Sequence, residues 1–316
     1  MSSSELHIES WRGTCVESAH VVDAIAVDHT GEVVLSLGDP TRAVTWRSAA
    51  KPFQLQVSLN ALPDKLVARL RDQDIALGLA SHTAEPNHLK TLDVLSKELR
   101  VDFEELQCGA HPPINLAAHQ KYLRAGERIT AQHNNCSGKH LFMLGACHAH
   151  FGSPKEYLSP EHPLQRTILQ LLNRFGTIET TVIDGCGAPC FVSDLKVLAQ
   201  VWGTLKDIDS PALTRIRKAM LSQPWYYSGS ERLDYQLASE GRGLLTKVGA
   251  AGLIAGILLD KGVSFAIKIR DGSDAARPLA THEVLRKLGH VRSHNETLLR
   301  HNVSGTPVGH WEARWQ

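Results

Sequence analysis

Strand-like patterns occur at both ends of the chain, and the long middle is patterned as helices. Extended apolar runs lie near 13–28, 33–37, 244–248, 254–259 and 263–269, with a last strand near 307–315. Strands at the two ends bury their apolar faces best by sharing a sheet. The pattern therefore predicts an α+β fold, with an antiparallel sheet formed by N- and C-terminal strands and a helical lobe packed beside it.

The same pattern predicts one domain over residues 1–316, with a helical insert at roughly 100–240 and an active cleft between the two lobes. Helical spacing is found near 85–99, 138–150, 163–175, 193–205, 211–221, 230–239 and 278–288. The apolar run 74–80 predicts a short strand that ends at Ser81, whereas 51–59 fits either a strand or a buried helix.

The charge balance argues against nucleic acid or an anionic membrane as partner. Lys and Arg number 34 against 33 Asp and Glu, a formal net charge of +1. The apolar stretch 248–259 is too short to span a bilayer, and the polar start of the chain lacks the pattern of a secretory signal. We therefore expect a cytoplasmic protein with a small-molecule substrate, whose six cysteines are thiols or metal ligands.

Residues 46–54 read WRSAAKPFQ and place Ser48 three positions before Lys51. On a helical turn this spacing puts the lysine amine within reach of the serine hydroxyl. A neutral amine can take the hydroxyl proton and make the serine a nucleophile. The spacing also occurs by chance at helix starts, so taken alone it is a weak signal.

Reactive residues are concentrated in three further loops: SHTAEP at 81–86, HNNCSGKH at 133–140 and DGCGAPC at 184–190. Each loop also has a plain structural explanation, since Asn and Gly form turns and buried cysteines are small hydrophobes. A thiolate pair suits zinc, but Cys186 and Cys190 lack the usual spacing of a zinc knuckle.

With CGAHPP, KVGAAG, KIRDG and HNVSGTPVG, these blocks make the chain resemble the Rhizobium-type asparaginase II family from about Val16 to Val308. The resemblance implies hydrolysis of L-asparagine to L-aspartate and ammonia by a homodimer. It also implies a fold similar to that of the serine β-lactamases and glutaminases. Several blocks in register are far more specific than one Ser-Lys spacing.

The resemblance implies roles for individual residues. Ser48 with Lys51 would form one Ser-Lys tandem, and Ser81 with Lys268 a second. The assignment of Lys268 rests on KIRDG alone, with Lys247 as its competitor.

Further residues belong to the implied binding sites. Cys136, Lys139 and Cys186 match positions that hold zinc in the family, and His140 and Asp184 lie close to it. With Arg47, His140 and Asp184 are expected to bind the substrate. Ala251 stands where the family has a glutamate, which puts substrate affinity or specificity in doubt.

A lysine base needs a lowered pKa. A free lysine, with a pKa of about 10.4, is neutral about once in two thousand times at pH 7. Burial, a second lysine, Arg47 or a zinc ion would each disfavour the ammonium form. Because serine already provides the nucleophile, zinc is expected to orient the substrate and not to be essential for the chemistry.

Two other functions stay open. Ser-x-x-Lys also belongs to β-lactamases and penicillin-interacting acyl enzymes, although clear Ser-Asp-Asn and Lys-Thr-Gly elements are missing here. The other is a non-catalytic zinc or amino-acid binding protein, which would release no ammonia from an amide. Asparagine and glutamine differ by one methylene, worth only about 1–3 kcal/mol in a pocket, so the sequence does not decide between them.

Overall fold

The computed structural model describes residues 5–241, 243–290 and 298–316. This part of the chain forms two compact units. The sheet unit comprises Met1–Ala49, Ser193–Gly203 and Thr246–Gln316, and the helical unit comprises Ala50–Val192 and Thr204–Leu245. The helical unit thus begins about fifty residues before the insert expected from the sequence, because the helices after Ala50 belong to it.

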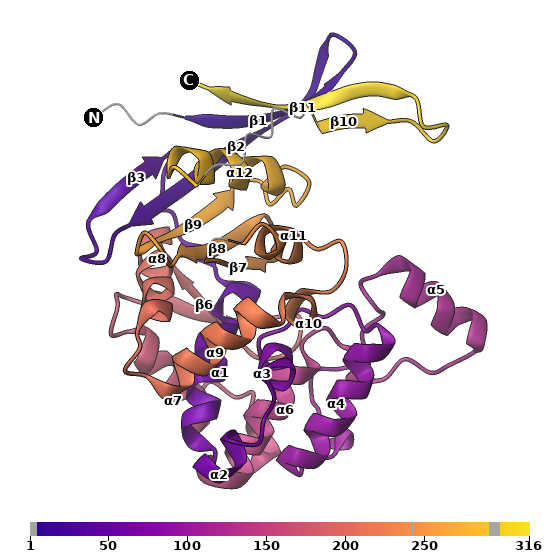
Figure 1. The fold of residues 1–316 in the computed structure, drawn as a ribbon, viewed down its shortest axis with the longest axis vertical. Helices are drawn as coiled ribbons and strands as arrows, with labels where there is room; N and C mark the ends of the chain where they lie inside the picture. The colour runs from indigo at the N-terminus through magenta and orange to yellow at the C-terminus, as the bar shows by residue number, and fades with distance from the viewer. Residues whose placement is uncertain (1–4, 242, 291–297) are drawn as a thin grey trace. The chain divides into compact units, whose positions relative to one another are not determined.

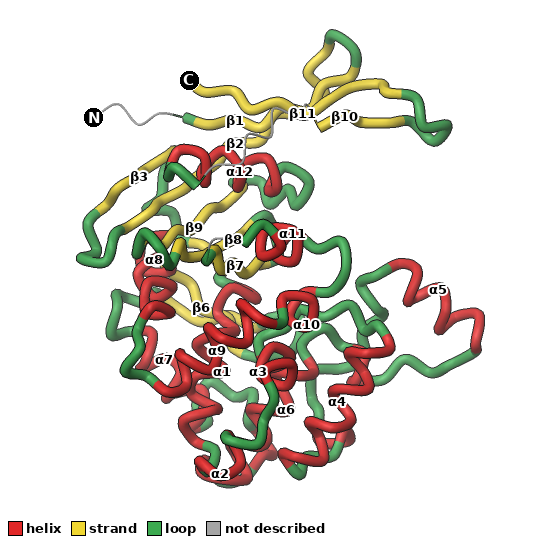
Figure 2. Tube along the Cα trace, in the orientation of Figure 1, coloured by secondary structure: helices red, strands yellow, loops and turns green. Residues whose placement is uncertain are grey.

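Strands from both ends of the chain form one sheet in the sheet unit (Figures 1 and 2). Its order is β10-β11-β1-β2-β9-β8-β7, and β3 pairs with β2. The strands are β1 (Leu6–Arg12), β2 (Cys15–Val27), β3 (Val33–Leu37), β7 (Leu244–Gly249), β8 (Leu253–Leu258), β9 (Val263–Ile269), β10 (Leu298–His301) and β11 (Pro307–Trp315). Since β1 lies antiparallel between β2 and β11, the predicted sheet from the two termini is confirmed.

Burial differs between the strands of this sheet. All residues of β7 and β8 are buried, although β7 is the last strand in the order, so both faces of these two strands are covered. In β1, Leu6, Ile8 and Ser10 are buried while the residues between them are partly exposed, which is the alternation of a half-covered strand. Helices α8 (Leu195–Gly203) and α12 (Arg277–Lys287) pack on β9 and complete the core of this unit.

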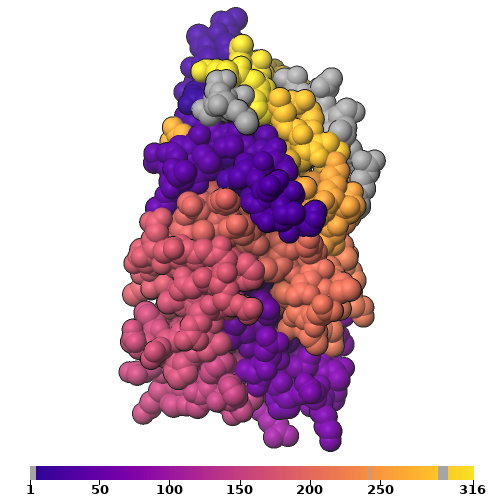
Figure 3. Space-filling view, turned by 90° about the vertical axis from the view of Figure 1, so that its left-hand side faces the viewer, coloured from indigo at the N-terminus to yellow at the C-terminus, as the bar shows by residue number. Residues whose placement is uncertain are grey.

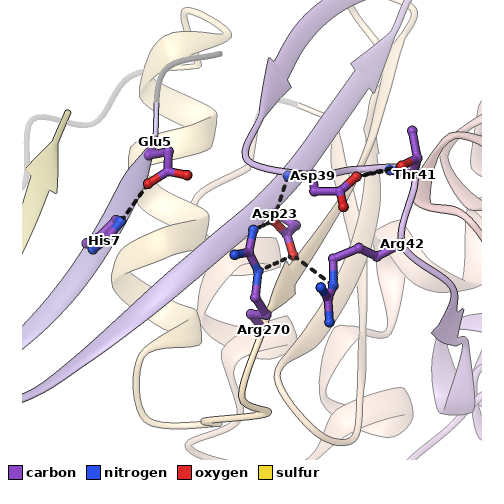
Figure 4. Close-up of polar contacts among 7 residues, drawn as sticks. All are labelled: Glu5, His7, Asp23, Asp39, Thr41, Arg42 and Arg270. Atoms are coloured by element: carbon purple, nitrogen blue, oxygen red, sulfur yellow. Dashed lines mark hydrogen bonds and ion pairs between the residues drawn. The ribbon is translucent and has the colours of Figure 1, made fainter.

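An ion pair with a buried carboxylate joins β2 to the turn after β9 (Figure 4). Asp23 has a side chain only 2% exposed and accepts hydrogen bonds from the Arg270 guanidinium at 2.5 and 3.1 Å. The Asp39 backbone N–H adds a hydrogen bond of 2.8 Å, and Arg42 lies 3.9 Å from the same carboxylate. These contacts fix the β2–β9 pairing, in which Asp23 stands opposite Lys268.

The helical unit is built around α6 (Ser137–Ala146), in which every residue is buried. Helices α1 (Lys51–Ala61), α3 (Asp72–Gly78) and α4 (Pro86–Leu99) pack against it. The remaining elements are α2 (Asp64–Val67), α5 (Leu116–Ala125), α7 (Pro163–Leu172), α9 (Pro211–Ser222), α10 (Pro224–Ser228), α11 (Leu233–Ser239), β5 (Thr180–Ile183) and β6 (Pro189–Ser193). The N-terminal end of α6, which carries Lys139 and His140, is therefore held inside the unit.

Two local predictions are decided by the structure. The strand predicted at 74–80 is wrong, because these residues fall largely in α3, whose first turn is closed by Asp74 bonding back to the Arg71 N–H. Its apolar run is too short for periodicity to separate a strand from a buried helix. The ambiguous stretch 51–59 is helix α1, with Pro52 in its first turn, where a missing N–H costs no hydrogen bond.

Most other predicted helices and strands are present at nearly the predicted bounds. The elements that were not predicted are α2, α5, α10, β1, β4 (Val44–Thr45), β6 and β10. The segment around 150–190, pink in Figure 3, forms a continuous part of the molecular surface. Ile183, at the end of β5, is 79% exposed. Among the described helices, none combines the length and apolar character needed to cross a membrane.

Candidate active site

Lys51 and Ser81 form a buried polar pair in the helical unit. Lys51 is 1% exposed and Ser81 3%. The Lys51 Nζ lies 2.5 Å from the Ala80 carbonyl oxygen and 3.0 Å from the Ser81 hydroxyl oxygen. Lys51 opens α1, and Ser81 follows α3, so the packing of two helices brings the amine to the hydroxyl. An amine and a hydroxyl at this distance can exchange a proton.

The backbone around Ser81 is fixed from two directions. The Ser81 N–H donates to the Tyr227 carbonyl at 3.0 Å, and the His82 N–H donates to the Asn135 carbonyl at 3.2 Å. Ala84 has a φ of 54°, a left-handed conformation that is unfavourable for a residue with a Cβ. The surrounding hydrogen bonds hold this strained loop, which is typical of functional sites.

Ser48 lies in the sheet unit, on the short 3-10 helix η1 (Arg47–Ala50). The residues before and after Ser48 are anchored within this unit. The Trp46 indole donates to the Ser193 hydroxyl at 2.8 Å, and the Trp202 indole donates to the Ala49 carbonyl at 3.2 Å. Arg47 has a φ of 45°, so the chain enters η1 through a left-handed residue. The position of Ser48 is therefore strictly defined within its own unit.

Lys268 and Lys247 also belong to the sheet unit. Lys268 lies on β9 and donates to the carbonyl of Ala251, and burial lowers its pKa against the raising effect of nearby aspartates. Lys247 is fully buried on β7, and its amine lies 3.3 Å from the Val248 carbonyl. A lowered pKa is what a lysine base requires, and Lys268 has this property.

Cys136, Lys139 and Cys186, the three residues that the resemblance assigns to zinc, come together in the helical unit. The Lys139 ammonium lies 3.2 Å from the Cys186 sulfur. A hydrogen bond from the Cys136 thiol, followed by the Lys139 charge, lowers the pKa of Cys186, whereas the same pairing and burial raise the pKa of Cys136. Burial disfavours the charged form of Lys139, but the two sulfurs outweigh it and raise its pKa. The lowered pKa favours the thiolate form of Cys186.

His140 and Asp184 lie in the same region. The His140 Nδ1 lies 2.7 Å from the Tyr157 hydroxyl, and burial lowers the His140 pKa against the opposing effect of Cys186. The Nε2 atom is buried and has no nitrogen or oxygen partner among the described residues. Asp184 follows β5, and its negative charge contributes to the raised pKa of Lys139. Sequence reasoning missed Tyr157, because only packing places it beside His140.

The donor set around Cys186 has the chemistry that zinc prefers, namely two sulfurs and nitrogen ligands. The His140 ring also forms a hydrogen bond with Cys186, so an imidazole lies beside the sulfur atoms. Across residues 5–241, 243–290 and 298–316, no group of three or more His, Cys, Asp or Glu side chains is placed to hold a metal ion. A zinc site here would therefore need the Lys139 amine as a ligand.

Taken together, the fold and this site define an α+β protein with a buried serine–lysine pair. Beside this pair lies a group formed by Cys136, Lys139 and Cys186, here called the thiolate cluster. A match to the model of one protein family covers almost the whole chain. Residues 8–313 match the model of the L-asparaginase II family, and the chain belongs to that family. The family membership supports an amidohydrolase that acts on a small-molecule amide.

Solved structures of low sequence identity also align with the chain. A β-lactamase from Mycobacterium bovis is 13% identical, with 84% of this chain and 94% of that chain covered and a TM-score of 0.44. A β-lactamase/D-alanine carboxypeptidase from Pseudomonas syringae is 12% identical, with 86% and 94% covered and a TM-score of 0.45. A Bacillus glutaminase is 11% identical, with 85% and 91% covered and a TM-score of 0.38.

These proteins are of the two kinds named in the sequence-based expectation, β-lactamases and glutaminases. Their TM-scores are below 0.5, so the description of the fold rests on the observed strand order and not on this likeness. No curated protein sequence matches the chain.

Proposed function

We propose that the protein hydrolyses L-asparagine to L-aspartate and ammonia. The observation that carries the proposal is the contact between the buried Lys51 amine and the Ser81 hydroxyl at 3.0 Å, in a chain of the L-asparaginase II family. A hydroxyl becomes a competent nucleophile when a neighbouring base accepts its proton. The pair supplies both groups without the need for a bound cofactor.

In the proposed reaction a serine oxygen attacks the side-chain amide carbon of asparagine. Lys51 accepts the hydroxyl proton and returns it to the departing nitrogen, so that the C–N bond breaks and ammonia leaves as an aspartyl ester forms. Water then attacks the ester carbonyl, and the serine regains its proton. Backbone N–H groups near the serine would stabilise the tetrahedral oxyanion.

Two serines are candidates for the acyl group. Ser48 is the nucleophile expected from the sequence, and its contacts within the sheet unit hold it in a defined place. Ser81 is the hydroxyl that Lys51 contacts. Mass spectrometry of proteolytic peptides from a trapped aspartyl enzyme tells them apart, because the aspartyl group adds its mass to the peptide that contains the nucleophilic serine.

Substrate recognition is proposed to involve Arg47, His140 and Asp184. Arg47 is a cation suited to the α-carboxylate of asparagine, since guanidinium binds carboxylates in a fork geometry. Asp184 is an anion suited to the α-ammonium group. His140 offers an imidazole nitrogen with no other nitrogen or oxygen partner in the described chain. These roles rest on the family resemblance and on the chemistry of the side chains.

We also propose a zinc ion held by Cys136, Lys139 and Cys186. When bound, zinc would act as a Lewis acid that orients the amino-acid substrate. The Cys136 thiol and the Lys139 charge lower the pKa of Cys186, which favours the thiolate form that binds zinc. The family resemblance further suggests a homodimer, which light scattering after size-exclusion chromatography would test.

Ammonia release is the test of the proposed function. The wild-type protein should release ammonia from L-asparagine, and the same assay on L-glutamine gives the amide preference. Ser48→Ala and Ser81→Ala proteins are compared with it after circular dichroism shows that each is folded. Wild-type rates in both variants would exclude the serine mechanism, and absence of ammonia release from either amide by the wild-type protein would exclude the amidohydrolase.

A further inference from the structure

His82 occupies a buried position directly after the proposed catalytic Ser81, and the reaction described above does not use it. Its side chain is 1% exposed. The Ala84 backbone N–H donates to His82 Nδ1 at 3.2 Å, and His82 Nε2 lies 2.9 Å from the Ser137 hydroxyl oxygen. Both ring nitrogens are therefore engaged by neighbours in the helical unit.

The hydrogen bonds define one tautomer. Nδ1 accepts from a backbone N–H, so the ring proton is on Nε2 and is donated to Ser137. The Ser137 hydroxyl in turn donates to the Gln132 carbonyl at 2.9 Å. A carbonyl cannot donate, so the chain of hydrogen bonds runs in one direction from Ala84 through His82 and Ser137 to Gln132.

This arrangement excludes His82 as a general base. Its acceptor nitrogen is occupied by the Ala84 N–H. Burial, followed by the nearby His88, Lys51 and His133, lowers the pKa of His82 against the opposing effect of a hydrogen bond with the Asn134 backbone. A neutral imidazole that accepts one hydrogen bond and donates another can hold two segments of the chain together. It joins the SHTAEP loop to the segment 132–137 at the start of α6, which precedes Lys139.

We infer that His82 is a positioning residue that holds Ser81 in register with Lys51 by tying the loop to Ser137. The inference rests on the proposed function of Ser81. The backbone contacts of Ser81 with Tyr227 and of His82 with Asn135 fix the main chain, but Ala84 is left-handed and strained. The imidazole connects this strained residue to α6. Its loss should therefore let the loop move and shift the Ser81 hydroxyl relative to the Lys51 amine.

Substitutions that copy one ring nitrogen at a time test the link. In H82Q the amide nitrogen can replace Nε2 and keep the bond to Ser137, whereas H82N copies the Nδ1 side and loses that bond. S137A removes the partner itself. We expect H82N and S137A to lower kcat for ammonia release about 10- to 100-fold with little change in KM, because small misplacements of a nucleophile are costly. H82Q should retain most of the rate.

Ser58 provides the matched control. It is 1% exposed in α1, and its hydroxyl donates only to the Gln54 carbonyl at 3.2 Å. S58A and S137A each delete one buried hydroxyl, so their thermal stabilities should fall alike, while kcat should fall only in S137A. Equal kcat in S58A and S137A would overturn the inference.

A second readout does not depend on activity. Hydrogen exchange of the amides in 81–84 should be faster in S137A than in S58A, and nitrogen NMR of the wild-type protein should show the Nε2–H tautomer of His82. Unchanged exchange in S137A or the Nδ1–H tautomer would contradict the positioning role. If S81A keeps the wild-type rate, the proposed function of Ser81 fails, and exchange alone then decides whether His82 holds the loop.

Discussion

The Lys51 amine and the Ser81 hydroxyl lie 3.0 Å apart although the two residues are 30 positions apart in the chain. The resemblance pairs Lys51 with Ser48 and Ser81 with a lysine near the end of the chain. In the helical unit, however, the packing of α1 and α3 gives Ser81 a lysine partner of its own. This contact is the reason why we propose Lys51 as the proton acceptor for Ser81.

Replacing Lys51 by Met should abolish most activity. The substitution keeps the length and apolar stem of the side chain but removes the amine, so kcat for ammonia release should fall by about 10²–10⁴. The exposed Lys65 in α2 is the matched control, and K65M should keep the wild-type rate. A folded K51M protein with more than half of the wild-type kcat would contradict the assigned role.

The two lysines of the sheet unit should differ in their effects. K268M should lower kcat about 100-fold, since burial already lowers the pKa of Lys268 as a base requires. K247M should mainly change stability, because Lys247 is fully buried on β7. The measurement pairs kcat with urea unfolding for both variants. The reverse result would move the second tandem from Lys268 to Lys247.

Metal content tests the thiolate cluster. Wild-type protein dialysed against zinc should retain about one ion per chain, and C136S and C186S should each lose most of it, because soft thiolates hold zinc. Cys147 is buried in the same unit but lies outside the cluster, so C147S is the control. Elemental analysis by mass spectrometry measures the content. Equal zinc in C186S and C147S would remove the proposed site.

Acid sensitivity should depend on His88. Burial lowers the pKa of His88 from 6.5 to about 4 in the folded protein. Between these values the unfolded chain binds a proton that the folded chain does not, so stability is full above pH 6.5 and falls as the pH drops toward 4. Each pH unit costs up to about 1.4 kcal/mol for this residue.

His88→Phe should reduce that slope. His88 is stacked on Trp225 with ring centroids 4.0 Å apart, an arrangement that Phe can keep. Urea unfolding at several pH values between 7 and 4.5 gives the slope, with His111→Phe at an exposed position as the control. A slope equal to that of the wild-type protein would show that His88 does not contribute.

The ion pair of Asp23 should be a major support of the sheet unit. Asp23→Asn removes the charge that faces Arg270 and should lower the free energy of unfolding by about 1–2 kcal/mol, because charge-assisted hydrogen bonds to the buried carboxylate are lost while the Arg270 side chain, 32% exposed, keeps its contact with water. Asp39→Asn is the control, because that carboxylate is bonded locally to Thr41 (Figure 4). Denaturant unfolding compares the two variants, and equal losses would refute the special role of Asp23.

The sequence alone predicts elements whose signals are local. The strand at 263–269 matches β9, because a β-branched and aromatic run follows the turn at Lys261 and Gly262. The helix predicted from 163 begins at Pro163 as α7, since proline fits the first turn and an apolar stripe follows. The alternation of Leu6 and Ile8 in β1 was present in the sequence but lies in a polar start that gave no strand prediction.

The residues of the candidate site are also found in the sequence, as short blocks that resemble a known family. Those blocks supply Ser48, Lys51, Ser81, Cys136 and Cys186, and the family match over 8–313 confirms the family. The blocks do not state which side chains touch. The run at 74–80 shows the same limit, because its residues suit either a strand or a buried helix.

Only the tertiary structure brings Lys51 to Ser81, Lys139 to Cys186, which is 47 positions away, and His82 to Ser137, which is 55 positions away. The backbone conformation of a segment depends largely on its neighbours in sequence, so patterns of a few residues carry it. Contacts between distant residues depend on how the helices around α6 pack, and packing is set by the shapes of many side chains at once.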